Sequence, residues 1–220
     1  MDWPAFWVTA RLAFWTTAIL FALGLPLAYW LATTRWRGKY LVEAVVALPL
    51  VLPPTVLGFY VLSAAGPNGP LGRGYEAATG GRLPFTFPGI LLGSVLFNLP
   101  FAVRPFAAAF AGVDRRLVEA SWCLGVSRPG TFVRVVLPRA WPGVLAGLVL
   151  TSAHTVGEFG VVLMVGGNVP GVTRTLSVAV YDDMQALDYE SAGRTALLLL
   201  GFAFGVLCLA QALGRRGPPA

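Results

Sequence analysis

The sequence predicts an all-α polytopic membrane protein with about five transmembrane helices. Hydrophobic residues make up 56% of the chain and charged residues only 12%, whereas charged residues make up about 25% of a soluble domain. The mean hydropathy is +0.71. The apolar residues gather in five long stretches, and about 20 such residues are needed to cross a bilayer as a helix. These stretches are continuously apolar, whereas the strands of a membrane barrel alternate, so we expect helices.

The five stretches form a single predicted transmembrane domain over residues 1–220. Its spans are expected at residues 12–33, 41–65, 88–112, 141–165 and 195–213. Basic residues gather in the loops that follow the first, third and fifth spans, and the loop before the fifth span is acidic. Loops rich in Lys and Arg stay in the cytoplasm, so we expect the N-terminus outside and the C-terminus in the cytoplasm. This orientation also accounts for the net charge of +6 without nucleic acid as a partner.

The second stretch contains three prolines, Pro49, Pro53 and Pro54. Proline removes a backbone donor and kinks a helix. Such breaks persist in membranes where neighbouring helices or a water-filled cavity satisfy the freed carbonyls. The prolines are consistent either with a packing kink or with a transport path. Pro53, Pro54 and the adjacent Thr55 are therefore candidates for residues that line such a path.

The fourth stretch contains two ionisable residues, His154 and Glu158, at a spacing that places them on one helix face. An ionisable group inside a membrane usually faces the bundle interior or an aqueous path, which makes Glu158 a candidate path residue. The alternative is that Glu158 lies near the outer end of the span, where it is solvated or caps a helix. His154 is expected to be a hydrogen-bonded packing residue. Cys123 and Cys208 lack the spacing of metal ligands.

The segment between the third and fourth spans, residues 113–138, is expected in the cytoplasm. Asp114 suits the N-cap of a short helix, and Gly125 suits the end of that helix. A second helix can begin at Ser127, because the proline that follows is tolerated in a first helical turn. A break is expected at Pro138, before the fourth span begins. The segment is thus predicted to be two short helices joined by a glycine turn.

One flank of the first short helix is expected to carry Leu117, Val118, Ser121 and Leu124. A compact knob of this kind can fit a groove on a cytoplasmic partner. The alternative is a basic amphipathic loop that rests on anionic lipid.

The same segment also resembles a known motif. It contains an acidic–alanine–small triplet, a glycine after three intervening residues, and an aliphatic–x–Leu–Pro ending. These residues are Glu119, Ala120, Ser121, Gly125, Val135, Leu137 and Pro138. The pattern resembles the EAA loop of ABC importer permeases. It departs from that pattern at Ser121, where the family often has Ala, and at Val135, where Ile is frequent.

The resemblance implies a type I ABC importer permease fold and a division of labour with partner subunits. It implies that the segment docks into cytoplasmic ABC ATPase subunits, that Glu119 contributes to the contact, and that Gly125 allows the turn. ATP and Mg²⁺ would then be bound by the ATPase, and this chain, which has no G-x-x-x-x-G-K-[ST] loop, would be a transporter subunit without a cofactor and not an enzyme. The implied assembly is a homodimer in the lipid of a bacterial inner membrane, with an extracytoplasmic binding protein.

Two further stretches resemble the molybdate and tungstate permeases and their sulfate relatives. One is LPLVLPPTVLGFYVL at 48–62 with GPNGPLG at 66–72, and the other is the GEFG-to-VAVY run within 155–181. The resemblance implies import of an oxyanion, molybdate first, by alternating access; a sulfate or thiosulfate permease is the alternative. An oxyanion needs hydrogen-bond donors or guanidinium groups along its route. Thr173 and Arg174 are candidates, although Arg174 taken alone reads equally well as a surface charge.

Two other classes of protein fit the sequence less well. A secondary transporter predicts inverted repeats and paired ion sites inside the membrane, and the sequence shows neither. A membrane enzyme needs paired acids, a metal cluster or an activated nucleophile, and none of these accompanies His154.

Overall fold

The computed structural model describes residues 2–214 of the 220-residue chain. In this range the chain is almost entirely helical and contains no strand. The helices are α1 (Trp3–Thr33), α2 (Lys39–Val51), α3 (Pro54–Ala65), α4 (Pro70–Thr79), α5 (Phe87–Ala111), α6 (Arg115–Cys123), α7 (Arg128–Thr131), α8 (Leu137–Val156), α9 (Gly160–Gly166), α10 (Leu176–Gln185) and α11 (Tyr189–Gly214). A π-helical turn, η1 (Phe132–Val136), joins α7 to α8.

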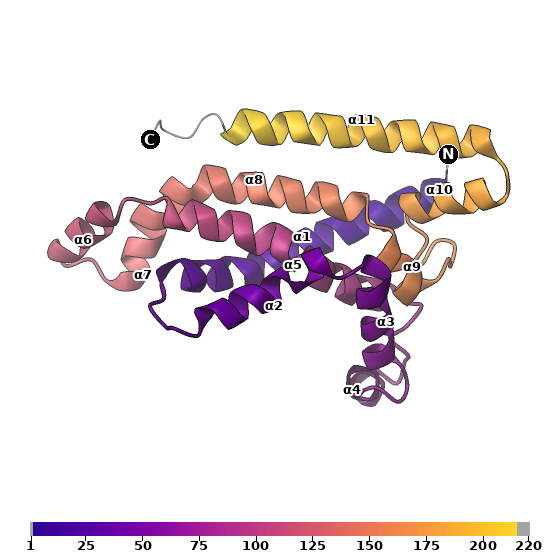
Figure 1. Ribbon diagram of the computed structural model, residues 1–220, viewed down its shortest axis with the longest axis horizontal. Coiled ribbons are helices and arrows are strands. Elements are labelled where there is room, and N and C mark those ends of the chain that lie inside the picture. The colour runs from indigo at the N-terminus through magenta and orange to yellow at the C-terminus, as the bar shows by residue number, and fades with distance from the viewer. Residues whose placement is uncertain (1, 215–220) are drawn as a thin grey trace.

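Within residues 2–214, four helices are long and apolar enough to cross a membrane, namely α1, α5, α11 and the continuous helix Arg128–Val156. The pair α2 and α3 makes a fifth span if the two helices are counted together. The expectation of an all-α protein with about five spans is therefore confirmed. Helices α1, α5 and α8 run side by side, and α11 lies along the outer side of α8 (Figure 1).

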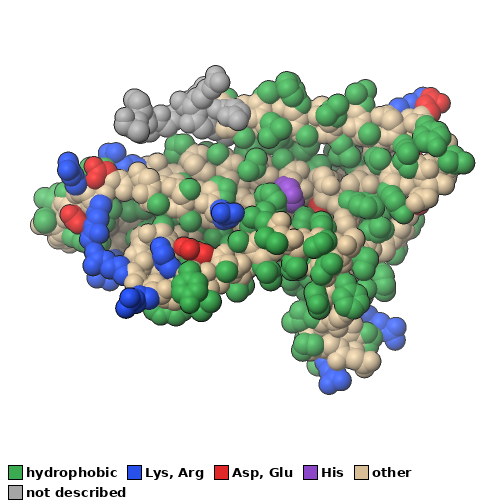
Figure 2. Space-filling view, viewed as in Figure 1, with side chains coloured by type: hydrophobic (Ala, Val, Ile, Leu, Met, Phe, Trp, Pro, Cys, Tyr) green, Lys and Arg blue, Asp and Glu red, His purple; other side chains and the backbone are tan. Residues whose placement is uncertain are grey.

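The core lies where α1, α5 and α8 meet. Its largest buried side chains include Leu20 from α1, Val103 and Phe106 from α5, and Val144 from α8. Large apolar side chains on the outside of the same helices remain exposed, as expected of a surface that lipid covers. Basic side chains gather at the end of the molecule that carries α6, α7 and the turn between α1 and α2 (Figure 2). The sequence predicts that this end faces the cytoplasm.

The second span is broken by a bend of 112° between α2 and α3. Pro49 remains inside α2, and the break falls at Leu52 and Pro53, where the backbone is extended. Pro54 then occupies the first turn of α3, the position at which a helix tolerates a proline. The bend turns α3 out of line with α2 and packs it against α9, and α4 projects beyond the end of α3 (Figure 1).

The fourth span differs from its prediction at both ends. The expected helix over 141–165 is interrupted, because α8 ends at Val156 and α9 begins only at Gly160. The expected break at Pro138 does not occur. The N–H of Leu137 donates to the carbonyl of Phe132, five residues earlier. This wide turn shifts the hydrogen-bond register just before Pro138, so the missing proline N–H does not end the helix.

Candidate coupling and translocation sites

Helices α6 and α7 form a knob at the basic end of the molecule, as the sequence predicts. Asp114 caps α6, and its Oδ1 accepts from the N–H of Arg116 at 2.8 Å. Ser127 caps α7, and its Oγ accepts from the N–H of Gly130 at 3.4 Å. Between the two helices Gly125 has φ of +77°, a conformation that residues with a Cβ rarely adopt.

A buried polar contact holds the two helices of the knob together. The hydroxyls of Ser121 and Thr131 are 3.0 Å apart, and both side chains are buried. The N–H of Val126 also donates to the carbonyl of Ser121 at 3.1 Å. Leu124 does not join this contact, because 83% of its surface is exposed. Ser121 therefore stabilises the turn, while Leu124 belongs to the tip of the knob.

The outer surface of the knob combines one carboxylate with exposed apolar groups. Glu119 accepts from Nε of Arg115 at 2.8 Å, and the two side chains keep 52% and 69% of their surface exposed. Ala120, Trp122 and Leu124 are exposed as well. Apolar groups beside a charge are typical of a surface that a partner protein covers.

The EAA-like residues thus fall into separate groups. Glu119, Ala120 and Gly125 lie on the exposed surface of the knob, and Ser121 lies inside it. Leu137 and Pro138 lie at the start of α8, where Leu137 packs against the core of the bundle. The knob is therefore joined to the core through η1 and α8.

A second cluster of polar residues lies at the break between α8 and α9. Glu158 sits in this break with 3% of its surface exposed, so the alternative of a solvated Glu158 is wrong. Its Oε2 accepts from Oγ of Ser94 at 2.6 Å and from Nδ2 of Asn98 at 2.8 Å. Oδ1 of Asn98 lies 2.8 Å from Nδ1 of His154. Glu158 and His154 therefore do not share a helix, but Asn98 links them.

His154 is a hydrogen-bonded packing residue, as predicted. Besides its contact with Asn98, its ring stacks on Phe101 with the ring centroids 3.7 Å apart. Phe97 lies beside it at 5.3 Å.

The two broken spans face each other across a pocket of about 430 Å³. The pocket is lined by Pro54, Thr55, Phe97, His154, Gly157, Glu158, Phe159 and Gly160. A Cβ on Gly160 would lie 2.8 Å from Cβ of Pro54, so the glycine permits this close approach of α3 and α9. Within the described part of the chain, Oε1 of Glu158 has no hydrogen-bond partner. The pocket thus contains a buried acceptor together with the hydroxyl of Thr55 and the ring of His154.

The other candidate path residues lie outside this pocket. Pro53 precedes α3 and is not part of the lining. Thr173 is fully buried, donates to the carbonyl of Gly166 at 2.7 Å, and accepts from the N–H of Val169 at 3.2 Å. Its hydroxyl therefore stabilises the loop between α9 and α10.

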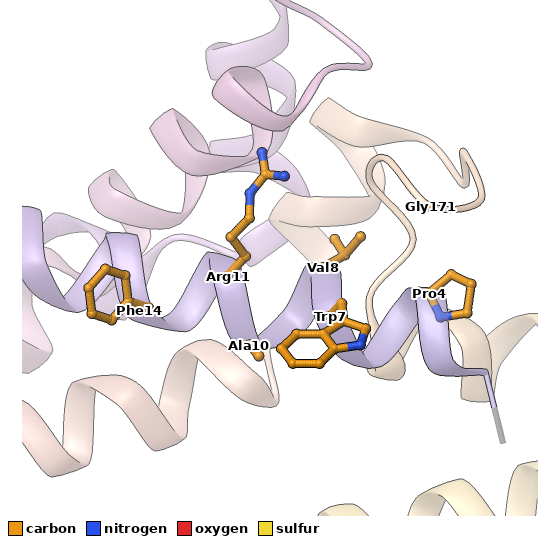
Figure 3. A pocket seen from close by; sticks show the side chains of 7 residues that line it. All are labelled: Pro4, Trp7, Val8, Ala10, Arg11, Phe14 and Gly171. Carbon is orange, nitrogen blue, oxygen red and sulfur yellow. The ribbon is translucent and has the colours of Figure 1, made fainter.

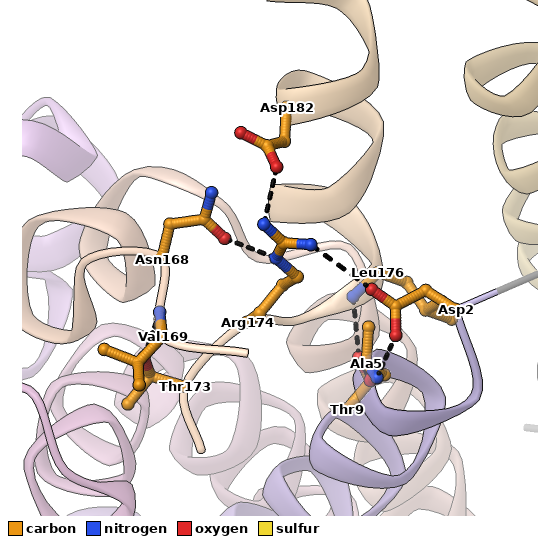
Figure 4. A network of polar contacts seen from close by, with 9 residues as sticks. All are labelled: Asp2, Ala5, Thr9, Asn168, Val169, Thr173, Arg174, Leu176 and Asp182. Carbon is orange, nitrogen blue, oxygen red and sulfur yellow. Dashed lines mark hydrogen bonds and ion pairs between the residues drawn. The ribbon is translucent and has the colours of Figure 1, made fainter. Parts of the chain in front are cut away.

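Arg174 is held by acidic and amide groups (Figure 4). It donates to Oδ1 of Asn168 and to Oδ2 of Asp182, both at 2.6 Å, and it lies 3.6 Å from Oδ2 of Asp2. These contacts tie the start of α1 to α10, so the guanidinium has a structural role here.

Ser94 and Asn98 were not singled out from the sequence. The sequence does indicate that these two residues are unusual, because they are polar and lie four positions apart within the apolar stretch 88–112. Such a pair lies on one helix face, and a polar face inside a membrane turns toward the bundle. What the sequence did not show is that this face meets the break in the fourth span.

Comparison with known proteins identifies the family. The family model described as binding-protein-dependent transport system inner membrane component matches residues 24–216. The chain is 48% identical over 206 residues to the molybdenum transport system permease protein ModB of Azotobacter vinelandii, covering 94% of this chain and 91% of that one. It is 29% identical to a probable sulfate transport system permease protein cysT of Chlorella vulgaris, over 94% and 78% of the two chains.

The fold is also that of known importers. An inward-facing structure of the MetNI methionine ABC transporter is similar with a TM-score of 0.74 and 19% identity, over 97% of this chain and 94% of that one. The resemblance to ABC importer permeases is therefore confirmed. The chain belongs to the family of binding-protein-dependent transport system inner membrane components.

Proposed function

We propose that this permease subunit imports molybdate into the cytoplasm by alternating access, driven by a partner ATPase. The observation that carries the substrate class is the 48% identity to a molybdenum permease over 94% of the chain. The more distant likeness to a probable sulfate permease supports an oxyanion more generally and keeps sulfate as the second candidate. A tetrahedral dianion is recognised by hydrogen-bond donors and positive charge.

The knob formed by α6 and α7 is proposed to be the contact with the ATPase. It lies at the basic end of the molecule (Figure 2), and the positive-inside rule places this end in the cytoplasm. The N-terminus is then outside and the C-terminus inside. Exposed Trp122 and Leu124 supply an apolar anchor, and Glu119 supplies the charge. ATP and Mg²⁺ would be held by the ATPase, and two permeases would pair above two such subunits.

The pocket between the broken spans is the proposed segment of the translocation path. Thr55 offers a hydroxyl donor to a passing oxyanion, whereas Glu158 offers acceptor oxygens that do not favour it. We therefore assign Glu158 a positioning role. Its carboxyl accepts a hydrogen bond from Oγ of Ser94 on α5. Its backbone carbonyl accepts a hydrogen bond from Oγ of Ser177 on α10 at 2.6 Å. These contacts fix the geometry of the break between α8 and α9. A path with few hydrogen-bond donors binds its substrate weakly and therefore releases it readily.

Reconstitution of the permease with its ATPase and its binding protein in vesicles tests the substrate. We expect molybdate or tungstate to stimulate ATP hydrolysis, because the permease responds to the binding protein when that protein carries its substrate. The measurement is the ATPase rate with each anion at equal concentration. Stimulation by sulfate alone would contradict molybdate as the substrate and would assign the permease to the sulfate group. If no oxyanion stimulates hydrolysis, the proposal that the substrate is an oxyanion is wrong.

A further inference from the structure

Arg11 is a cation on the outer surface of α1 that the transport mechanism does not use. Its Cζ lies 3.8 Å from the centroid of the Phe87 ring, a cation–π contact. Within residues 2–214 the guanidinium forms no ion pair, in contrast to Arg174, which has two carboxylates within reach. The side chain is exposed, so its N–H groups remain available to a ligand.

Arg11 is one of the residues that line a hollow of about 500 Å³ (Figure 3). Its lining includes Trp7, Val8 and Phe14 from α1, and Gly171 from the loop between α9 and α10. Trp7 and Phe14 keep 67% and 64% of their surface exposed. The hollow therefore combines one positive charge with apolar walls that open to the outside of the bundle.

The position of Arg11 along α1 matches the level of the lipid headgroups. The apolar stretch 12–33 begins directly after it, and at about 1.5 Å per residue these residues span roughly 33 Å, close to the thickness of the hydrocarbon core. Arg35 marks the other boundary. Trp3, Trp7 and Trp15 are exposed near Arg11, and tryptophan gathers at the membrane–water interface.

We propose that this hollow binds an anionic phospholipid of the leaflet on the N-terminal side. Arg11 holds the phosphate by charge-assisted hydrogen bonds, Phe87 fixes the guanidinium from behind, and one acyl chain lies along Trp7 and Phe14. The site rests on the membrane-spanning fold and on no assumption about the transported substrate. Under the proposed orientation the lipid belongs to the outer leaflet.

Native mass spectrometry of the full chain in complex with its ATPase tests the site. The probes are phosphatidylglycerol and phosphatidylcholine with the same acyl chains, titrated onto delipidated complex. We expect the first to bind more tightly, and we expect Arg11→Gln to weaken its binding roughly tenfold, as the loss of a hydrogen bond to a charged group does. Arg73→Gln, which removes an exposed arginine on α4, should leave binding unchanged.

Equal binding of the two lipids, or unchanged binding by Arg11→Gln, would overturn the proposal. Inorganic phosphate or molybdate added at millimolar concentration distinguishes the possible sources of the anion. If the lipid stays bound in the presence of these anions, the result supports a lipid site. Full displacement of the lipid would assign the hollow to a free oxyanion and would overturn the proposal. If Arg11→Gln does not fold, the comparison of the two lipids and the competition on the unmodified chain decide. None of these readouts depends on transport.

Discussion

Glu119→Lys is expected to abolish uptake while the permease still folds and inserts. In the proposed complex this substitution places a positive charge where the ATPase receives a carboxylate. Losing one member of a buried charged contact costs about 2 kcal/mol or more, roughly 30-fold in Kd. Folding should be nearly unaffected, because Glu119 is half exposed and a surface ion pair contributes only about 0–1 kcal/mol. Co-purification of the ATPase and substrate-stimulated hydrolysis are the measurements.

The chain offers a matched control for this substitution. Glu190 pairs with Arg194 at the start of α11 with the same four-residue spacing, at the opposite end of the molecule from the knob (Figure 1). Glu190→Lys should leave the ATPase bound. Normal co-purification and normal coupling in Glu119→Lys would remove Glu119 from the contact, and loss of the ATPase in both variants would point to a general effect of charge.

Asn98→Leu is expected to lower both stability and transport. Asn98 is fully buried and connects Glu158 to His154. The leucine would leave the Glu158 carboxyl with Ser94 as its remaining side-chain donor and His154 without its amide partner. A buried polar group that loses its partner costs about 1–3 kcal/mol, so we expect a lower unfolding temperature. Uptake should fall roughly tenfold or more, since about 1.4 kcal/mol corresponds to a factor of ten in rate.

Thr151→Val serves as the control for Asn98→Leu. Thr151 is also buried in the bundle, but its hydroxyl donates only to the carbonyl of Gly147 in the same helix, at 2.8 Å. We expect this variant to fold and to transport almost normally. If Asn98→Leu keeps normal uptake and stability, the network does not shape the path.

The helices and the knob were predictable because their signals are local. Apolar stretches of about 20 residues are sufficient to predict spans. Asp114 and Ser127 have the side chains that cap a helix, and Gly125 has the freedom that its turn requires. Each of these inferences needs only a few neighbouring residues.

The site at the broken spans was only partly predictable, because it depends on contacts between distant segments. Glu158 was recognised as an ionisable residue in a span, but its donors lie about 60 positions earlier on α5. Pro138 was expected to end a helix, and the wide turn of η1 prevents this. The contacts of Arg174 with Asp2 and Asp182 likewise depend on how α1 packs beside α10.

Cross-linking from Cys123 tests the proposed coupling most directly. Cys123 is an exposed thiol at the end of α6, and Cys208 is an exposed thiol on α11. A photoreactive reagent attached to each thiol in turn, with the other cysteine replaced by serine, reports the neighbour of that position in the whole complex. We predict that Cys123 cross-links to the ATPase and that Cys208 does not. A complex that hydrolyses ATP in response to substrate, with no cross-link from Cys123 to the ATPase, would contradict the assignment of the α6–α7 knob as the coupling site.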